Sequence, residues 1–358
     1  MKIAFFGSSL VSAYWNGAAT YYRGIIRALH GLGHCVTFYE PDAYERQAHR
    51  DMADPDWARV VVYQPGPEGS PSDETWRAID EARAADLVIK ASGVGIHDSF
   101  LEAALLDLRR SDRVVAFWDV DAPATLDRLA GDAGDPFHAL VPRYDLILTY
   151  GGGDPVTAAY ETRGARLCVP IYNGLDPDTH FPAPPDPRFE ADLAFLGNRL
   201  PDREARVEDF FLGAACASPD RRFLLAGNGW ADKLMPDQVR YLGHLSTVDH
   251  NAFNSTPLAV LNIARESMAR YGFSPATRVF EAAGAGACLI TDLWEGLDLF
   301  LEPGREILTA RDGAEVATHL HTLTPKRATE IGLAARRRVL ASHTYAHRAA
   351  RLAAVLGV

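Results

Sequence analysis

The chain has 358 residues, which is longer than one small domain and fits two. With 47% hydrophobic and 23% charged residues it can bury ordinary cores, and this composition excludes a disordered chain. A net charge of −11 argues against a general nucleic-acid binder, which needs a basic surface, although local arginines can still hold an anionic ligand.

Nothing in the sequence indicates a membrane span or export. No apolar run approaches the roughly 18 residues of a membrane span. The start, MKIAFFGSS, lacks the charged region, apolar stretch and cleavage site of a signal peptide. The four cysteines lie far apart, and we expect reduced core thiols in a cytoplasmic protein: Cys35, Cys168, Cys216 and Cys288.

Short apolar runs alternate with amphipathic stretches in the first half of the chain, where helices are predicted at 18–29, 73–84 and 99–109. This alternation, with strands rich in valine, isoleucine and leucine, is typical of a parallel sheet covered on both faces. The predicted strands cover 2–6, 35–39, 60–63, 86–91, 114–118, 145–149 and 166–169.

A proline-rich segment divides the chain. Pro182, Pro184, Pro185 and Pro187 predict a semi-rigid linker, because such a run continues neither a helix nor a central strand. The alternation then resumes, and the tail at 325–358 predicts two helices broken near His343. The predicted strands of this half cover 192–196, 222–226, 239–242, 258–263 and 287–291.

The predicted fold class is therefore α/β, with two doubly wound, Rossmann-like domains. We place the first domain at 1–175, the hinge at 176–190, the second domain at 191–340 and a last helix at 341–358. Ligands of such sheets bind at the carboxyl ends of the strands, so a central cleft between facing domains is the expected site.

The stretch Phe273–Asp292, FSPATRVFEAAGAGACLITD, predicts a largely buried helix that leads through a glycine turn into an apolar strand. Arg278 and Glu281 lie three apart on that helix, and a surface ion pair is their ordinary interpretation. Burial favours a ligand instead, because a buried pair without one is costly. The Glu281 carboxylate is well placed to accept hydrogen bonds from a diol such as ribose.

The residues before this helix also fit an anionic ligand. Arg265 lies just beyond the carboxyl end of a predicted strand. We expect Ser274 or Thr277 to cap the helix, and the free amides behind the cap suit a phosphate.

The turn after the first strand carries Gly7 without the glycine spacing of a dinucleotide fingerprint, which sets an oxidoreductase aside. Asn16 and Gly17 open a helix at the end of this loop. Two interpretations remain: a phosphate on exposed helix amides, or an ordinary N-cap by Asn16.

Asp119 and Asp121 end an apolar strand, and three interpretations compete. The first is an Asp-x-Asp metal site on a diphosphate. The second is a pair of residues that orients a sugar or acts as a base. The third is a helix cap, in which Asp121 precedes Ala122 and Pro123. The two-domain layout disfavours the metal.

Asn198 and Arg199 form the exit loop of the first strand of the second domain. The Arg199 guanidinium could fork onto a diphosphate and stabilise a leaving nucleotide. Arg203 and Arg206 are interpreted as partners of neighbouring carboxylates on a solvated helix.

Taken together and in their order along the chain, five sequence stretches resemble those of the GT-B glycosyltransferases. The resemblance is greatest to the retaining family-4 group and to the spore-maturation (CgeB-like) glycosyltransferases. The likeness rests on Asn16-Gly17 through the first helix to HGLGHCVTFYE, VPIYNGLDPDTHFPAPP, AFLGNR, VRYLGHLSTVDHNAFNSTPLAVLNIAR and VFEAAGAGACLITDLWEGLDLFLEPGREIL. It implies an acceptor-side N-terminal domain, a C-terminal domain that binds a nucleotide sugar, and a last helix that packs back on the N-terminal domain.

The resemblance also implies residue roles. Glu281 would hold the ribose hydroxyls, Gly17 would approach the donor diphosphate and Arg199 would bind it. Asp119 and Asp121 lie where retaining relatives carry a histidine near the donor sugar. The segment that flanks the base would comprise Tyr241, Gly243 and His244.

Besides the Asp119 strand end, which replaces the histidine near the donor sugar, two positions depart from the family-4 pattern. Phe273 stands where that group has the first of two glutamates, which contacts the donor sugar. Glu204 stands where it has a lysine, for which Arg203 and Arg265 are the candidate substitutes. The nucleotide half of the site is therefore better predicted than the sugar half.

The sequence thus predicts transfer of a sugar from a UDP-, GDP- or dTDP-linked donor to a hydroxyl acceptor, with no metal, cofactor or nucleic acid. Cell-surface, spore-coat and secondary-metabolite glycosylation are the expected settings. Two alternatives stay open: a catalytically silent nucleotide-sugar-binding protein, and a sugar-nucleotide epimerase or hydrolase.

Overall fold

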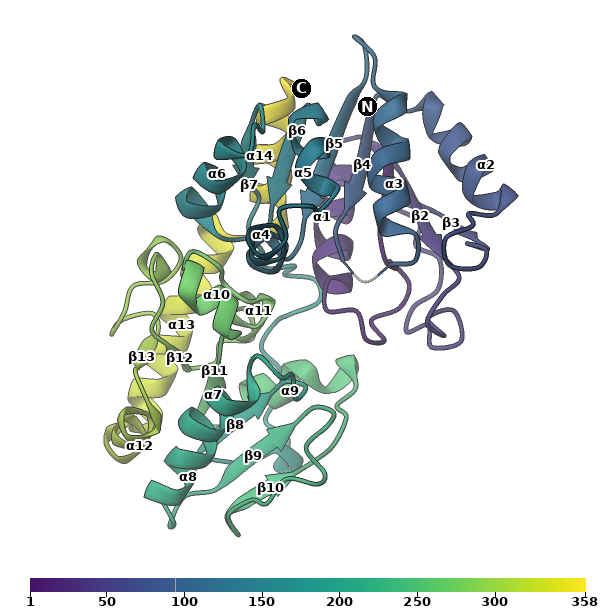
Figure 1. The fold of residues 1–358 in the computed structure, drawn as a ribbon. Coiled ribbons are helices and arrows are strands. Elements are labelled where there is room, and N and C mark those ends of the chain that lie inside the picture. The colour runs from purple at the N-terminus through teal and green to yellow at the C-terminus, as the bar shows by residue number, and fades with distance from the viewer. Residues whose placement is uncertain (94) are drawn as a thin grey trace. The chain divides into compact units, whose positions relative to one another are not determined.

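The computed structural model describes residues 1–93 and 95–358. These residues form two compact units: unit 1 contains Met1–Tyr172 and Tyr345–Val358, and unit 2 contains Asn173–Thr344. Each unit has one parallel sheet with helices packed around it (Figure 1). The α/β fold with two Rossmann-like units is confirmed.

Unit 1 contains a seven-stranded sheet in the order β3-β2-β1-β4-β5-β6-β7. All neighbouring strands are parallel, and β4 is buried along its whole length, as expected of a sheet covered on both faces. The strands are β1 (Lys2–Phe6), β2 (Cys35–Pro41), β3 (Arg59–Tyr63), β4 (Leu87–Ala91), β5 (Val114–Asp119), β6 (Leu146–Thr149) and β7 (Cys168–Pro170). The helices are α1 (Ala19–Gly31), α2 (Asp73–Glu81), α3 (Asp98–Ala104), α4 (Ala122–Gly131), α5 (Phe137–Leu140), α6 (Gly153–Thr162) and α14 (Tyr345–Leu356).

The last helix, α14, belongs to unit 1 and packs on α1. The helices come close because position 24 is a glycine: a Cβ atom on Gly24 would lie 2.2 Å from the Tyr345 ring. The Tyr345 ring also meets Tyr21 edge-on, with centroids 5.9 Å apart. The C-terminal helix therefore returns to the N-terminal unit, as predicted.

Unit 2 contains a six-stranded parallel sheet in the order β10-β9-β8-β11-β12-β13. The strands are β8 (Leu193–Leu196), β9 (Phe223–Ala226), β10 (Val239–Tyr241), β11 (Ala259–Asn262), β12 (Leu289–Asp292) and β13 (Leu308–Ala310). The helices are α7 (Glu204–Val207), α8 (Ala214–Ala217), α9 (His250–Ser255), α10 (Glu266–Tyr271), α11 (Thr277–Gly284), α12 (Gly313–Thr322) and α13 (Pro325–Ser342), with a π-helical turn at Glu208–Gly213 between α7 and α8.

Every predicted strand is present, and the tail forms two helices that separate at His343. Among the described strands, the sequence missed only β13. The cysteine prediction was wrong for Cys35 and Cys216, which are exposed, while Cys168 and Cys288 are buried. Within the described residues, every helix is too short or too polar to cross a membrane.

Candidate active site

The strand order of unit 2 reverses at one point. The chain runs outward from β8 through β9 to β10, and then from β11 through β12 to β13, so that β8 and β11 are neighbours in the middle. In such sheets a ligand binds outside the carboxyl ends of the strands where the order reverses. The exit loops of β8 and β11, at 197–203 and 263–265, both lie at this edge.

Glu281 is buried on α11, with 6% of its surface exposed. Two basic side chains face its carboxylate: His180 Nε2 lies 3.9 Å from Oε1, and Arg278 Nη1 lies 3.6 Å from Oε2. Both distances exceed that of a hydrogen bond, and no other donor among the described residues bonds to this carboxylate. A buried acceptor with free capacity is expected to gain from a ligand that donates hydrogen bonds.

The charges around Glu281 favour its ionised form. Burial alone would raise the pKa of Glu281, but the charges of His180, Arg278 and His250 hold it below its ordinary value. Burial lowers the pKa of Arg278, which disfavours its charged form, and its Nη1 has no hydrogen-bond partner among the described residues. The pair is ionised yet poorly hydrogen-bonded, which is the state that a polar ligand relieves.

His250, at the start of α9, makes the folded state sensitive to acid. Burial and then the charge of Arg278 lower the pKa of His250 from 6.5 to about 4. Its contribution to stability is therefore fully present above pH 6.5 and is lost as the pH falls toward 4, because the unfolded chain binds the proton first. We expect a loss of up to about 3 kcal/mol.

Urea unfolding at pH 7 and pH 4.5 measures this effect. His250→Asn, which cannot take up the proton, is expected to lose less stability over that interval than the unaltered chain. Equal losses in both proteins would show that other groups cause the acid sensitivity.

The start of α11 differs from the prediction that Ser274 or Thr277 caps it. The N-cap residue is Ala276, which has no side-chain cap, and the Ser274 hydroxyl donates to Gly272 O at 2.8 Å. The first amides of α11 therefore lack a side-chain acceptor, a condition that favours an anion. Phe273 has a left-handed backbone, with φ of 47°, and a Cβ atom on Gly296 would lie 2.2 Å from its ring.

Arg199 lies on the β8 exit loop, and its guanidinium forms ion pairs with two carboxylates. Its Nη2 is 2.6 Å from Glu204 Oε1, and its Nη1 is 2.9 Å from Asp232 Oδ1. These hydrogen bonds raise the pKa of Arg199 and lower that of Glu204 to about 2.

Three other arginines gather at the same edge. The Arg203 guanidinium packs on Gly197 and donates to Asn198 O. Burial, followed by the charge of Arg278 and that of Arg265, lowers the pKa of Arg203 to about 10, although Asp202 opposes this shift. Arg265 forms an ion pair with that same Asp202, its Nε lying 2.6 Å from Oδ2. Each of these neighbouring positive charges makes the charged form of the others less favourable, and a bound anion would relieve that repulsion.

Arg206 is not the solvated residue that the sequence predicted. Its Nη2 lies 2.6 Å from Oδ2 of the buried Asp292, and its Nε donates to Ala264 O at 3.1 Å. Asp292 Oδ1 in turn accepts the Ala264 N–H at 3.1 Å. Arg206 and Asp292 thus hold both backbone groups of Ala264, and thereby fix the loop that presents Arg265.

The remaining predicted residues of unit 2 shape its loops. Asn198 Oδ1 accepts Asn228 N–H at 2.9 Å, and the Tyr241 hydroxyl donates to Gly227 O at 2.8 Å. Gly243 is left-handed, with φ of 73°, and His244 is exposed. These contacts connect the exit loops of β8, β9 and β10.

In unit 1, Asn16 organises the loop after β1. Its Nδ2 donates to Ser9 O and Ser12 O at 2.8 and 3.1 Å, and its Oδ1 accepts the Ser8 hydroxyl at 3.0 Å. The N-cap residue of α1 is Ala18, with no side-chain cap, so the N-cap interpretation of Asn16 was wrong. Gly17 is exposed, and a Cβ atom there would meet nothing within 4 Å, so the fold itself does not require a glycine.

Asp119, at the end of β5, is fully buried and receives several hydrogen bonds. Its Oδ1 accepts from the Ser92 hydroxyl at 2.7 Å, the Asp121 N–H at 3.0 Å and the Thr125 hydroxyl at 3.1 Å. Its Oδ2 accepts from the Tyr160 hydroxyl. Burial raises the pKa of Asp119, although these donors oppose the shift. Asp119 therefore joins β4, β5, α4 and α6.

Asp121 occupies the N-cap position of α4, with proline in the first turn. Its side chain makes no capping hydrogen bond, so the cap interpretation holds for its position but not for its carboxylate. Asp121 is only partly buried, in contrast to Asp119. Of the two aspartates, Asp121 is the more exposed residue, although its Oδ1 atom is buried.

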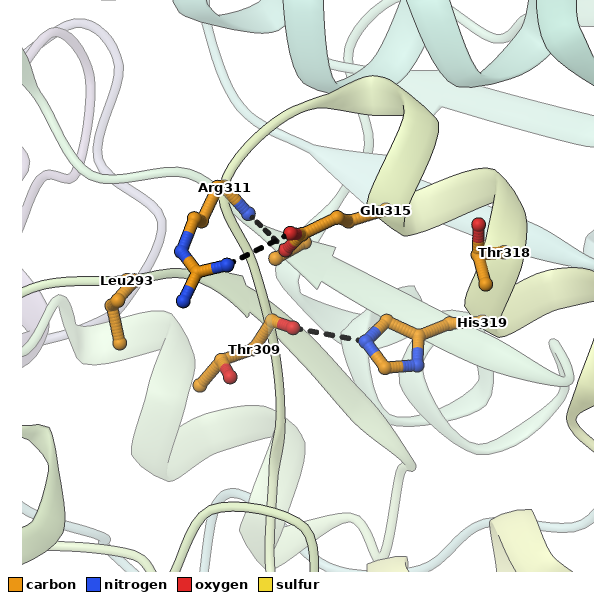
Figure 2. Close-up of a pocket in the computed structure, with 7 residues that line it drawn as sticks. Leu293, Thr309, Arg311, Glu315, Thr318 and His319 are labelled. Atoms are coloured by element: carbon orange, nitrogen blue, oxygen red, sulfur yellow. Dashed lines mark hydrogen bonds and ion pairs between the residues drawn. The ribbon is translucent and has the colours of Figure 1, made fainter.

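A surface pocket lies elsewhere on unit 2, at the carboxyl ends of β12 and β13 (Figure 2). Its volume is about 290 Å³. Arg311 bonds to Glu315 across it, and the His319 ring bonds to Thr309 O at 2.9 Å. No predicted site residue lines this pocket. Its lining residues are Leu293, Thr309, Ala310, Arg311, Glu315, Thr318 and His319.

Unit 2 therefore brings Arg265, Arg278, Glu281 and the β8 exit loop to one edge of its sheet. The sequence missed His180 and His250 beside Glu281, and it predicted carboxylate partners for Arg203, which instead donates to Asn198 O. His180 lies within the stretch VPIYNGLDPDTHFPAPP, but a lone histidine gave no signal that it faces a carboxylate a hundred residues later.

Comparisons with known proteins support this fold. Residues 203–354 match the family described as Glycosyl transferase-like. The structure of Anabaena HepE in complex with UDP and glucose has a TM-score of 0.69 and 15% identity, and the match covers 100% of this chain and 99% of that one. Sucrose-phosphate synthase from Thermosynechococcus elongatus has a TM-score of 0.70 and 14% identity, with 100% and 98% covered.

The T4 phage protein BGT, in complex with its UDP-glucose substrate, has a TM-score of 0.62 and 12% identity, with 100% of both chains covered. No curated protein matches the chain in sequence. At these identities the likeness to solved structures establishes the fold, which is GT-B.

Proposed function

We propose that this GT-B protein is a glycosyltransferase that moves a sugar from a nucleoside-diphosphate donor to a hydroxyl acceptor. One observation carries the proposal: the buried, ionised Glu281 accepts no hydrogen bond from the residues that the structure describes, and it lies on the helix that also carries Arg278, one of the gathered arginines. A carboxylate that accepts from a diol, together with cations that receive a diphosphate, matches the two polar parts of a nucleoside diphosphate.

In the proposed donor complex, Glu281 accepts the ribose hydroxyls. The diphosphate is received by Arg199, Arg203, Arg265 and the amides at the start of α11. These groups offset the charge that develops on the leaving nucleotide, in the place of a metal ion. The HepE and T4 phage structures contain UDP or UDP-glucose, which favours a uridine donor as the first to test.

For the acceptor side, we propose that Asp121 orients the sugar or acts as the base on the acceptor hydroxyl, because Asp119 is fully buried. A base predicts inversion at the anomeric carbon, whereas the resemblance to family 4 predicts retention. The anomeric configuration of the product, measured by NMR, separates the two. Cell-surface, spore-coat and secondary-metabolite acceptors follow from the resemblance to the CgeB-like group.

Incubation with UDP-, GDP- and dTDP-sugars, with and without hydroxyl acceptors, tests the proposal. Release of free nucleotide only with an acceptor is expected of a transferase. Release without acceptor indicates a hydrolase, an interconverted sugar indicates an epimerase, and binding without turnover indicates a silent binding protein. Loss of activity in excess chelator would contradict the metal-independent mechanism.

Arg203→Met is expected to weaken UDP binding about tenfold or more, because it removes charged hydrogen bonds to phosphate. Uridine affinity should not change. Calorimetric titration with both ligands measures this, and Arg305→Met, which removes an exposed arginine paired with Glu302, is the matched control. Equal losses for UDP and uridine would mean that Arg203 supports the loop and does not contact phosphate.

A further inference from the structure

Arg199, an arginine of the proposed diphosphate site, has two carboxylate partners. Glu204 is held at 2.6 Å and Asp232 at 2.9 Å, so both ends of the guanidinium are occupied. A diphosphate that binds Arg199 must take the place of at least one of these carboxylates. The two differ in exposure: 27% of the Glu204 side chain is exposed, against 78% for Asp232.

Glu204 has a second cation within reach. Lys233 Nζ lies 3.1 Å from Glu204 Oε1, which is the same oxygen that receives Arg199. Lys233 also contacts Glu208 at the start of the π-helical turn. One carboxylate oxygen is thus shared between two cations from different loops, because Arg199 follows β8 and Lys233 follows β9.

We propose that Glu204 is an internal competitor of the donor diphosphate for Arg199, and that Lys233 retains Glu204 when the diphosphate binds. The inference rests on the proposed function, since it concerns the same nucleotide site. In the ligand-free protein, Glu204 and Asp232 neutralise Arg199. In the complex, the phosphate oxygens occupy Arg199 and Glu204 pairs with Lys233 alone.

The shared oxygen keeps the free-energy cost of this exchange small. A partly buried carboxylate that lost its only cation would be left unpaired, at a substantial energetic cost. Glu204 keeps Lys233 throughout, and the exposed Asp232 returns to water. The exchange therefore needs a small side-chain rotation and no rearrangement of α7.

The same exchange acts on the product. After transfer, the nucleoside diphosphate carries more negative charge than the donor did and would bind the arginines more tightly. A carboxylate that returns to Arg199 competes with that product and favours its release. Glu204 thus sets the affinity for the nucleoside diphosphate.

Glu204→Gln tests the inference, because it keeps the shape of the side chain and removes the competing charge. We expect the Kd of UDP to fall about fivefold, as for the loss of one partly exposed ion pair. Glu208→Gln is the matched control, because it removes a charge from Lys233 without touching Arg199, and it should leave the Kd within about twofold. Melting temperatures of all variants establish that they fold.

A double-mutant cycle tests the role of Lys233. Lys233→Met alone should weaken UDP binding, because Glu204 then has only Arg199 as a partner. In the Glu204→Gln background the same change should have no effect. Persistence of the Lys233→Met loss in that background would show direct contact with phosphate and overturn the role given to Lys233.

The failures are distinguishable. If the unaltered chain binds no nucleotide, the proposed function and this inference both fail. If it binds UDP but Glu204→Gln binds UDP no better, or Arg199→Met binds it as well as the unaltered chain, only the competition fails. In that case the cluster holds the two loops together and does not regulate the nucleotide.

Discussion

Glu281→Gln is expected to weaken UDP binding about 10- to 100-fold, the largest effect of any single change in the site. The carboxylate is buried and accepts no hydrogen bond from the described residues, so under the proposed function the ribose hydroxyls would supply its donors. Glutamine keeps the volume but removes the charge, and its amide turns one acceptor into a donor. Calorimetric titration with UDP measures the loss.

Pyrophosphate provides the control ligand for this variant. It has no ribose, so Glu281→Gln should bind it as well as the unaltered chain or better, because Arg278 loses its carboxylate partner. Glu315→Gln, which removes a carboxylate from the pocket of Figure 2, should leave both ligands unaffected. Unchanged UDP binding by Glu281→Gln would show that the ribose assignment is wrong, even if the arginines bind phosphate.

Asp119→Ala is expected to lower the free energy of unfolding by about 3–5 kcal/mol. The change leaves the hydroxyls of Ser92, Thr125 and Tyr160 and the N–H of Asp121 without their buried acceptor. Asp119→Asn should cost less, because the amide oxygen retains some of these donors. Urea unfolding followed by circular dichroism measures both variants.

The matched control for Asp119 is Asp112→Ala, which removes a surface ion pair with Arg110 and should cost less than about 1 kcal/mol. If Asp119→Ala lowers the free energy of unfolding no more than this control does, the hydrogen bonds of Asp119 do not stabilise unit 1. A loss of transfer activity at unchanged stability would restore the interpretation of Asp119 as a residue that touches substrate.

Much of the fold could be predicted because its signals are local. Strands such as β4 and β11 are short, apolar and bounded by polar turns, and their alternation with helices is sufficient for two parallel sheets. The burial of Glu281 could also be predicted, because α11 has small or apolar residues around it. Such features depend on neighbours within one or two turns of chain.

The partners of the charged side chains could not be predicted in this way. Arg206 was expected to pair along its own helix, yet it bonds to Asp292, 86 residues away. Arg199 was expected to be open to a ligand, yet Asp232 binds it from a different loop. The sequence left open which of Asp119 and Asp121 faces a ligand, and the hydrogen bonds that Asp119 accepts from Tyr160 and Ser92 distinguish the two. Such choices depend on where the sheet brings distant loops together.

The docking of α14 on α1 affects how the protein is made. Unit 1 begins with the first residues of the chain, but Tyr345, Ala349 and Leu352 of α14 complete its hydrophobic core. A ribosome synthesises all of unit 2 before these residues emerge. Unit 1 is therefore completed only after unit 2 has been synthesised, and the face of α1 that receives α14 stays uncovered until then.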